Sequence, residues 1–314
     1  MMNDLSLSNP ISRRSCLQLA ALMTTQATLG WADEQKKQTI IDAHVHVWTA
    51  DTESYPLGPD YDKKDMQPKS FTPEELLTHT RPAGVDKIVL IQMSYYQFDN
   101  SYMLDTIAKY PDTFRGVAII DHEQADAHET MNKLLKQGVT GFRLYANADA
   151  TSQWLASKTM ATMWKTAADT GQAICLLANP DALPNIEKLC RKFPKTTVVV
   201  DHFGRIGVDG TICTKDLDNL CQLAQHENVY VKTSAFYALG KKQPPYEDLG
   251  PMIKRLRNTF GAKRLMWASD CPFQVENNHT YATSLTLIKD RLGFLTDEDK
   301  KWMLYKTADQ VYWS

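Results

Sequence analysis

The sequence predicts a single-domain (β/α)8 barrel of the TIM type. Between residues 39 and 273, eight short β-rich segments alternate with amphipathic helical segments, and this alternation is typical of a parallel sheet closed by helical crossovers. An open doubly wound sheet is the alternative, but no G-x-G-x-x-G motif follows the first strand, so we expect no nucleotide cofactor. Polar residues also gather at the predicted carboxyl ends of the strands, where barrel enzymes place their chemistry.

Each element has its own sequence signal. The helical segments include residues 72–80, 129–138 and 186–194, and Thr72, Pro73 and Glu75 form a capping-box start for the first of them. A closing helix is expected from Thr296. Residues 49–71 form the longest irregular stretch, which in a barrel is a loop at the catalytic end. The predicted strands are residues 39–48, 87–93, 114–120, 139–146, 172–179, 196–204, 229–235 and 264–273.

The composition is that of an ordinary globular protein. The 314 residues are 43% hydrophobic and 23% charged, with a formal net charge of −2, which gives no support for nucleic-acid binding. No apolar run after residue 40 approaches the roughly 18 to 20 residues that span a bilayer. Six cysteines without a C-x-x-C pair signal neither a disulfide framework nor a thiolate zinc site, so we expect small core residues.

The N-terminal 32 residues resemble a twin-arginine export signal. Arg13 and Arg14 precede a short apolar stretch that ends in Gly30-Trp31-Ala32, although Cys16 stands where a Phe is expected. We therefore expect residues 1–32 to be a signal peptide and residues 36–314 to be the barrel domain. The export machinery would then be a partner, and the mature protein would be periplasmic.

The first strand carries three ionisable side chains in an apolar run. Asp42, His44 and His46 alternate with apolar residues, so the two-residue period of a strand predicts that all three share one face. Two imidazoles placed two residues apart can converge on one ion or on one substrate oxygen. The alternative is that both histidines are hydrogen-bonded core residues.

Two further motifs complete a pattern with the one on the first strand. Asp-x-His-x-His at residues 42–46, Asp-His-Phe-Gly at 201–204 and Ser-Asp-Cys-Pro at 269–272 resemble the amidohydrolase superfamily, and more narrowly its amidohydrolase-2 branch. That branch contains sugar lactonases, 2-pyrone-4,6-dicarboxylate lactonase and related decarboxylases. The resemblance extends from residue 39 to about residue 313, and it implies a small-molecule substrate.

The resemblance also implies roles for individual residues. His44 and His46 would be the metal-ligand or substrate-binding pair, His202 the strand 6 histidine, and Asp270 the proton-transferring carboxylate. The fifth strand lacks the histidine of a full metal site, because Leu176, Leu177 and Ala178 stand there. We therefore expect at most one divalent ion, zinc or manganese, held by His44, His46 and Asp270, and metal-free catalysis stays open.

The remaining candidates would bind substrate. Arg143, with Tyr145 on the same face, offers a planar fork for a carboxylate or hydroxyl, and Arg205 and Gln92 are further candidates. Salt bridges or internal hydrogen bonds are the alternatives for each. Asp201 is expected to point to the opposite face from His202 and to have a structural role.

Together these features predict a hydrolase that opens a lactone or related cyclic ester. Asp270 would take a proton from the attacking water and return it to the leaving alkoxide, and His202 would bind the carbonyl or the water. A metal-dependent decarboxylase of the same branch is one alternative. A non-enzymatic periplasmic protein that binds a ligand in its barrel is another.

Overall fold

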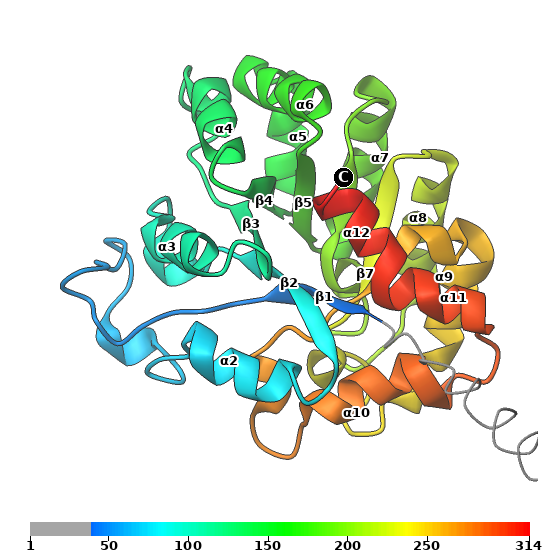
Figure 1. Cartoon of the computed structure of the whole chain (residues 1–314). Helices are drawn as coiled ribbons and strands as arrows, with labels where there is room; N and C mark the ends of the chain where they lie inside the picture. The colour runs from blue at the N-terminus through cyan, green and yellow to red at the C-terminus, as the bar shows by residue number, and fades with distance from the viewer. Residues whose placement is uncertain (1–38) are drawn as a thin grey trace, which may run out of the picture. The chain divides into compact units, whose positions relative to one another are not determined.

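Residues 39–314 form an eight-stranded parallel barrel surrounded by helices in the computed structural model, which describes this part of the chain (Figure 1). The predicted barrel and all eight predicted strands are confirmed, and the predicted signal peptide lies outside the described residues. The strands are β1 (Ile40–Val45), β2 (Val85–Ile91), β3 (Phe114–Ala118), β4 (Val139–Ala146), β5 (Ala173–Ala178), β6 (Val198–Val200), β7 (Val229–Thr233) and β8 (Leu265–Trp267).

The strands pair in the order in which they occur along the chain. The last and first strands are joined just beyond β8, where Val45 and Cys271 form a parallel bridge. The His46 amide donates to the Cys271 carbonyl at 2.8 Å, and the Asp270 amide donates to the His44 carbonyl at 2.9 Å. The backbone hydrogen bonds that close the barrel therefore fix the candidate residues of β1 beside Asp270.

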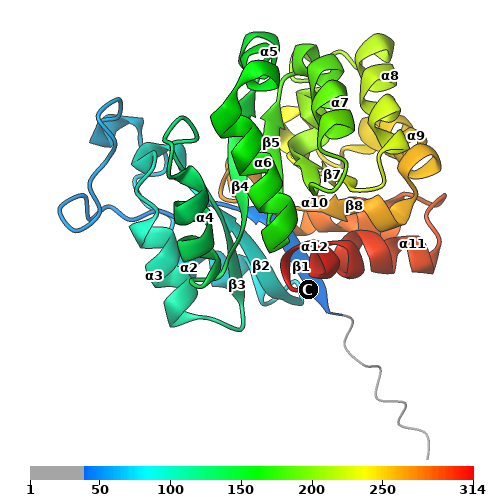
Figure 2. The same cartoon turned by 90° about the horizontal axis from the view of Figure 1, so that it is seen from above.

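The helices lie outside the strands, as the view in Figure 2 shows. The predicted start at Thr72 is confirmed, because its hydroxyl accepts from the Glu75 amide and the Glu75 carboxylate accepts from the Thr72 amide. The predicted closing helix is also present, but a π-helical segment at Trp302–Lys306 interrupts it. The helices are α2 (Pro73–Thr80), α3 (Ser101–Lys109), α4 (Ala127–Leu135), α5 (Ala148–Ala156), α6 (Lys158–Thr170), α7 (Leu183–Lys192), α8 (Thr214–Gln222), α9 (Gly250–Phe260), α10 (Tyr281–Thr286), α11 (Asp297–Lys301) and α12 (Thr307–Tyr312).

Apolar side chains fill the barrel below the candidate site. Residues such as Ile41, Val89 and Val199 pack together there with Val311 and Tyr312 of α12. Because Ile41 precedes the histidines along β1, this cluster lies toward the amino ends of the strands. Helix α12 therefore covers the end of the barrel opposite to the site.

Strand β1 contains a β-bulge that the alternating pattern does not reveal. Three steps along β1, starting at Asp42, pair with only two steps along β2. Ala43 packs in the interior cluster, yet the next residue, His44, also faces the interior and approaches Asp270. The prediction that Asp42 shares a face with His44 and His46 is therefore wrong, because the extra residue shifts the alternation by one position.

Strand β6 is shorter than predicted. It ends at Val200, and Asp201–Arg205 form a 3-10 turn in which His202 and Phe203 have left-handed φ angles of 50° and 56°. His202 reaches the interior through this turn. The prediction that Asp201 points to the other face is wrong, because the chain leaves the strand here and Asp201 lies beside buried cations within the barrel.

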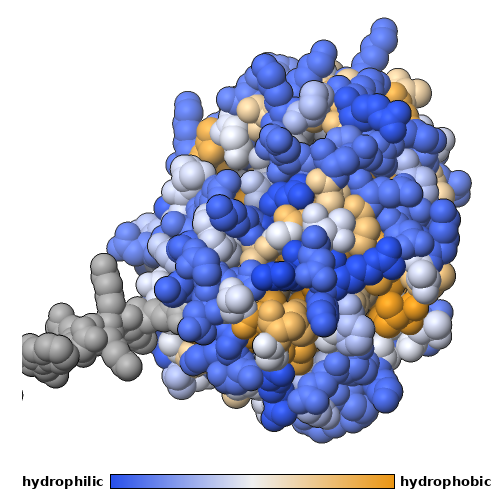
Figure 3. All heavy atoms as spheres, turned by 90° about the vertical axis from the view of Figure 1, so that its right-hand side faces the viewer, coloured by the Kyte–Doolittle hydropathy of each residue, from blue (hydrophilic) through white to orange (hydrophobic). Residues whose placement is uncertain are grey.

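The outer surface is mostly hydrophilic, with separate hydrophobic patches on the side where α9 and α11 lie (Figure 3). Among residues 39–314, no helix has the length and apolar character needed to cross a bilayer. The five cysteines of this range are free. Cys175, Cys190 and Cys271 are buried as predicted, whereas Cys213 is exposed, so the expectation of core residues is wrong at that position.

Candidate active site

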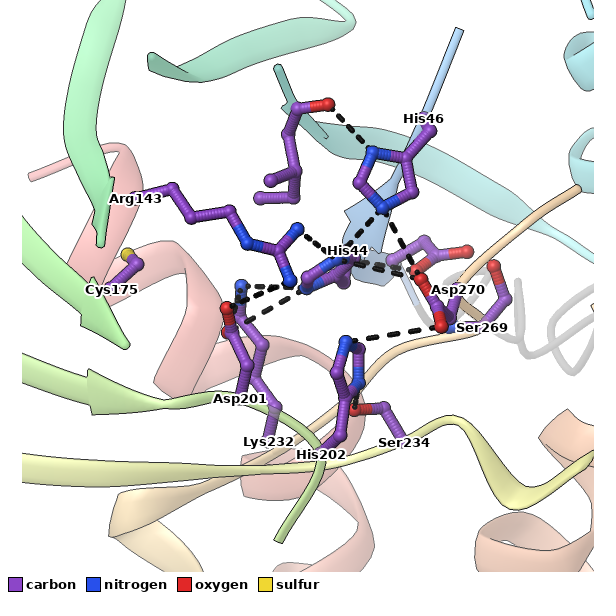
Figure 4. A network of polar contacts seen from close by, with 12 residues as sticks. His44, His46, Arg143, Cys175, Asp201, His202, Lys232, Ser234, Ser269 and Asp270 are labelled. Atoms are coloured by element: carbon purple, nitrogen blue, oxygen red, sulfur yellow. Dashed lines mark hydrogen bonds and ion pairs between the residues drawn. The ribbon is translucent and has the colours of Figure 1, made fainter. Parts of the chain in front are cut away.

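Three histidines from two different strand ends surround the carboxylate of Asp270 (Figure 4). The Nε2 atoms of His44 and His46 both lie 3.5 Å from Asp270 Oδ1, and His202 Nε2 lies 3.8 Å from Asp270 Oδ2. All four side chains are buried. Residues separated by up to 226 positions in the sequence thus form one cluster at the carboxyl ends of the strands, where the fold predicts the chemistry.

A cavity of about 340 Å³ opens above this cluster. His44 is fully buried beneath it, at 0% exposure, and does not line it. The volume suits a small ligand. The predicted site residues that do line the cavity are His46, Gln92, Arg143, Tyr145, His202, Arg205 and Asp270.

The carboxylate of Asp270 is held in its ionised form. Its backbone has a left-handed φ of 67°, which turns the side chain back toward the histidines after β8. Burial by itself raises the pKa of Asp270, but the polar contacts with the surrounding histidines, His202 first, outweigh it, so the pKa lies below its usual range. The Tyr237 hydroxyl also donates to Asp270 Oδ2 at 2.7 Å. Sequence reasoning missed Tyr237, which lies in a loop without a recognisable motif.

The ring nitrogens of His46 are assigned by a backbone contact. His46 Nδ1 lies 2.9 Å from the Ile91 carbonyl, which can only accept, so Nδ1 carries the proton. His46 Nε2 is therefore free to accept a hydrogen bond from water or to bind a metal ion.

His202 is held by the Ser234 hydroxyl, which lies 2.8 Å from its Nδ1. Burial lowers the pKa of His202 to about 4, against the opposing charge of Asp270. His202 is therefore neutral at pH 7 and offers one donor and one acceptor.

A second group of buried charges lies on the other side of His44. Lys232, on β7, is fully buried, and its Nζ lies 3.0 Å from Asp201 Oδ1 and 3.3 Å from His44 Nδ1. Arg143 Nη2 lies 3.8 Å from Asp201 Oδ2. Although burial raises the pKa of Asp201, the charge of Lys232 outweighs it and holds the pKa well below its usual range. Sequence reasoning missed Lys232, although a lysine within an apolar barrel strand signals a buried ion pair.

Two cations lie beside the two ring nitrogens of His44. Arg143 Nη1 is 3.3 Å from His44 Nε2, and Lys232 is at Nδ1. Burial, followed by the charge of Lys232, lowers the pKa of His44 well below its usual range. His44 is thus a neutral imidazole that links the charged pair Asp201–Lys232 to Asp270.

The three predicted metal ligands form a donor set that fits one divalent ion. Ligand atoms of His44, His46 and Asp270 all lie within 4.8 Å of one another. Two imidazole nitrogens and one carboxylate oxygen suit zinc or manganese, with a position left for water. The Arg143 guanidinium would have to move away from His44 Nε2 for an ion to bind there.

Asp42 has a structural position outside this cluster. Its Oδ1 accepts from the backbone amides of His44 and Ser269, at 3.2 and 2.9 Å, and its Oδ2 accepts from the Tyr281 hydroxyl at 2.7 Å. Asp42 therefore connects β1 to the segment after β8, at the point where the barrel closes.

The predicted substrate-binding residues differ in how far their polar groups already have hydrogen-bond partners within the protein. Arg143 keeps a buried Nε without a hydrogen-bond partner among the described residues. Tyr145 is 49% exposed, and its ring lies 5.7 Å from the Arg143 guanidinium carbon. Arg205 donates to Asn179 at 2.8 Å, and the Gln92 amide donates to the Asp99 carbonyl at 2.6 Å. Arg143 and Tyr145 are thus more available to a ligand than Arg205 and Gln92.

Comparison with known proteins agrees with the family that the sequence motifs predict. Residues 41–313 match the family model described as Amidohydrolase. The chain is 24% identical over 233 residues to L-fucono-1,5-lactonase of Burkholderia ambifaria, which covers 74% of this chain and 80% of that enzyme.

Two crystal structures have the same fold. One is a probable 2-pyrone-4,6-dicarboxylic acid hydrolase from Acinetobacter baumannii with bound citric acid, which has a TM-score of 0.72 and 23% identity over 88% of this chain and 99% of that one. The other is an amidohydrolase from Burkholderia multivorans with bound zinc, which has a TM-score of 0.72 and 17% identity over 87% and 99%. The chain therefore belongs to the amidohydrolase family, as its sequence motifs predict, and is a hydrolase of that family.

Proposed function

We propose that this protein opens a lactone of a sugar acid or of a carboxylated ring by hydrolysis, with Asp270 as the group that transfers the proton. One observation carries the proposal: the Asp270 carboxylate lines the cavity, and ring nitrogens of three histidines lie within 3.8 Å of its oxygens. Such a group can accept a proton at neutral pH and return it within the same site. Relatives that hydrolyse lactones give further support.

The reaction needs two proton transfers. The water oxygen forms a bond to the lactone carbonyl carbon while Asp270 takes one of its protons. The tetrahedral intermediate then breaks its bond to the ring oxygen, and Asp270 gives the proton to the departing alkoxide. The product is the open hydroxy acid, so one water molecule is added and Asp270 returns to its starting state.

The negative charge on the intermediate needs donors. His46 cannot supply one at Nε2, because its proton is on Nδ1. Arg143 can, since its buried Nε has no other partner, and His202 can donate from Nε2 when its Nδ1 accepts from Ser234.

One divalent ion bound by His44, His46 and Asp270 would polarise the carbonyl and lower the pKa of a bound water. Zinc or manganese is proposed on the donor set alone.

The test combines metal analysis with a panel of lactones. The purified full chain is assayed for metal content and for lactone hydrolysis before and after chelation, beside Asp270→Asn and Asp169→Asn, a substitution of an exposed aspartate on α6. We expect hydrolysis to fall about 10²- to 10⁴-fold in Asp270→Asn and to be unchanged in Asp169→Asn. Release of carbon dioxide from a carboxylated substrate without ring opening would support the decarboxylase instead. No turnover of any substrate would leave the ligand-binding protein.

We also propose export to the periplasm by the twin-arginine route, which rests on Arg13 and Arg14 in the sequence. The test is fractionation of cells that express the full chain or its Arg13→Lys/Arg14→Lys variant. We expect the wild-type protein in the periplasm and the variant in the cytoplasm. A wild-type protein that stays in the cytoplasm would contradict this proposal.

A further inference from the structure

A second cavity lies beside the catalytic one. Its volume is about 780 Å³, more than twice the 340 Å³ of the catalytic cavity. Ser94, Arg143 and Tyr145 line both cavities, so the two adjoin at these residues. A simple lactone ring fits the smaller cavity and leaves the larger one without a function.

Aromatic rings line this second cavity. Tyr61 comes from the long segment after β1, Phe98 from the segment after β2, and Trp154 from α5. His122 packs edge-to-face on Trp154, with ring centroids 6.2 Å apart. Phe98 is 55% exposed, so much of its ring is accessible at this cavity.

The exposed apolar side chains concentrate at the two cavities. Four large hydrophobic residues are exposed among those that the structure describes: Phe98, Leu135, Tyr145 and Val208. Phe98 and Tyr145 line the second cavity, and Tyr145 and Val208 line the catalytic one. Leu135 lines neither.

The polar groups of the second cavity select against an anion. Asp60 and Glu123 are acidic, and Gln97 and Gln153 are amides. The only cation in the lining is Arg143, which lies at the boundary and is already near Asp201. A carboxylated group would meet acidic side chains here without a free cation.

A hydrogen bond holds two of these polar side chains, Gln97 and Asp60, in place. The Gln97 amide donates to Asp60 Oδ2 at 2.6 Å, and Gln97 has a left-handed φ of 47°. This hydrogen bond connects the segment after β2 to the long segment after β1. The amide and carboxylate therefore face the cavity in a fixed arrangement with Tyr61 beside them.

We propose that the second cavity binds a neutral sugar ring attached to the lactone, so that the substrate has at least two rings. Aromatic faces cover the C–H surface of a sugar, and carboxylate and amide groups accept from and donate to its hydroxyls. The inference rests on the proposed lactone hydrolysis and gives its substrate class. The shared position of Arg143 and Tyr145 puts the second ring next to the lactone carbonyl.

The test compares matched substrates. Cellobiono-1,5-lactone and lactobiono-1,5-lactone each differ from glucono-1,5-lactone by one neutral ring, glucose in the first and galactose in the second. We expect the better of the two-ring lactones to have a kcat/KM at least about 10-fold higher than glucono-1,5-lactone, since this corresponds to one well-made ring contact. Equal or lower values for every two-ring lactone would overturn the inference while leaving the hydrolase intact.

Two substitutions locate the effect. Phe98→Ala and Gln153→Ala should each reduce the ratio of two-ring to one-ring kcat/KM by about 5-fold or more. Leu135→Ala is the matched control, because Leu135 is an exposed large hydrophobic residue outside both cavities, and it should leave the ratio unchanged. A ratio unchanged in both cavity variants would also overturn the inference.

Calorimetric titration with cellobiose and lactose separates the two proposals, because it needs no turnover. Binding that is weakened in Phe98→Ala supports the sugar site even if no lactone is opened, in which case only the proposed hydrolysis fails. Absence of binding by the wild-type chain, together with no preference for two-ring lactones, overturns the sugar site.

Discussion

Replacing Lys232 with methionine removes the nearest cation of a buried carboxylate. Methionine keeps most of the apolar stem, so the main change is the loss of the ammonium group 3.0 Å from Asp201 Oδ1. Both side chains have 0% exposure, so water cannot replace the lost partner. The remaining cation, Arg143, is 3.8 Å away from the other carboxylate oxygen.

The size of the effect follows from these distances. At an effective dielectric constant of about 20, two unit charges attract by about 5.5 kcal/mol at 3.0 Å and by about 4.4 kcal/mol at 3.8 Å. Asp201 thus loses rather more than half of its compensation in Lys232→Met. We expect the free energy of unfolding to fall by about 3 to 5 kcal/mol, as is typical when one partner of a buried pair is removed.

Urea unfolding measures this free energy for Lys232→Met, Asp201→Asn and the double variant. The double variant should be more stable than Lys232→Met, because no buried charge is left unpaired. Lys109→Met is the matched control: Lys109 pairs with Glu74 at 2.7 Å, but both side chains are more than half exposed, so we expect no measurable change in the midpoint. A Lys232→Met protein as stable as the wild type, or single-variant effects that simply add, would refute the reasoning.

Three further predictions concern the site and its frame. Tyr237→Phe removes the 2.7 Å hydrogen bond that orients the Asp270 carboxylate, so kcat/KM at pH 7 should fall by about 10-fold; Tyr246→Phe, which removes a hydroxyl that does not contact Asp270, should leave it unchanged. His202 takes a proton near pH 4 when folded but near pH 6.5 when unfolded, so the unfolded state binds more protons in between. Stability should therefore fall as the pH drops from 6.5 to 4, by about 3 kcal/mol in all, and urea midpoints for His202→Asn should lack this part of the slope. Asp42→Ala leaves two buried backbone amides without an acceptor and should lower the melting temperature well below that of Asp42→Asn, whose Oδ1 can still accept from both; equal melting temperatures would contradict this.

The order of the elements could be predicted from sequence because it depends on local patterns. Each strand is a short apolar run bounded by polar residues, and each gap holds a helical period, so the alternation survives errors of a few residues at the ends. The motif residues His44, His202 and Asp270 could also be predicted, since all three follow or end such runs.

Local backbone geometry could not be predicted in the same way. The bulge in β1 inserts one residue, and a prediction that assumes strict alternation along a strand cannot locate such an insertion. The turn at Asp201–Arg205 depends on left-handed residues that are not glycine, and no residue preference marks them. Both errors misplaced a carboxylate: Asp42 was expected inside and Asp201 outside.

Lys232 and Tyr237 were missed for different reasons. Lys232 does leave a signal, because a lysine in a strand that is buried on both sides requires a buried anion. Tyr237 leaves none, since its role depends on where the loop after β7 places the hydroxyl relative to Asp270. Tertiary position alone distinguishes it from other loop tyrosines.

Because of the bulge in β1, the geometry of the site also depends on the number of residues in this strand. His44 and His46 both point into the barrel, toward Asp270, only because one extra residue lies between Asp42 and Val45 relative to β2. Deleting Ala43 would keep Asp42, His44 and His46 in the chain but would change the direction of the two imidazoles relative to Asp42. Either the histidines would leave the site, or Asp42 would lose its contacts where the barrel closes. A conservative substitution at the same position keeps that spacing. The length of this short segment is therefore a functional property in its own right, separate from the identity of its side chains.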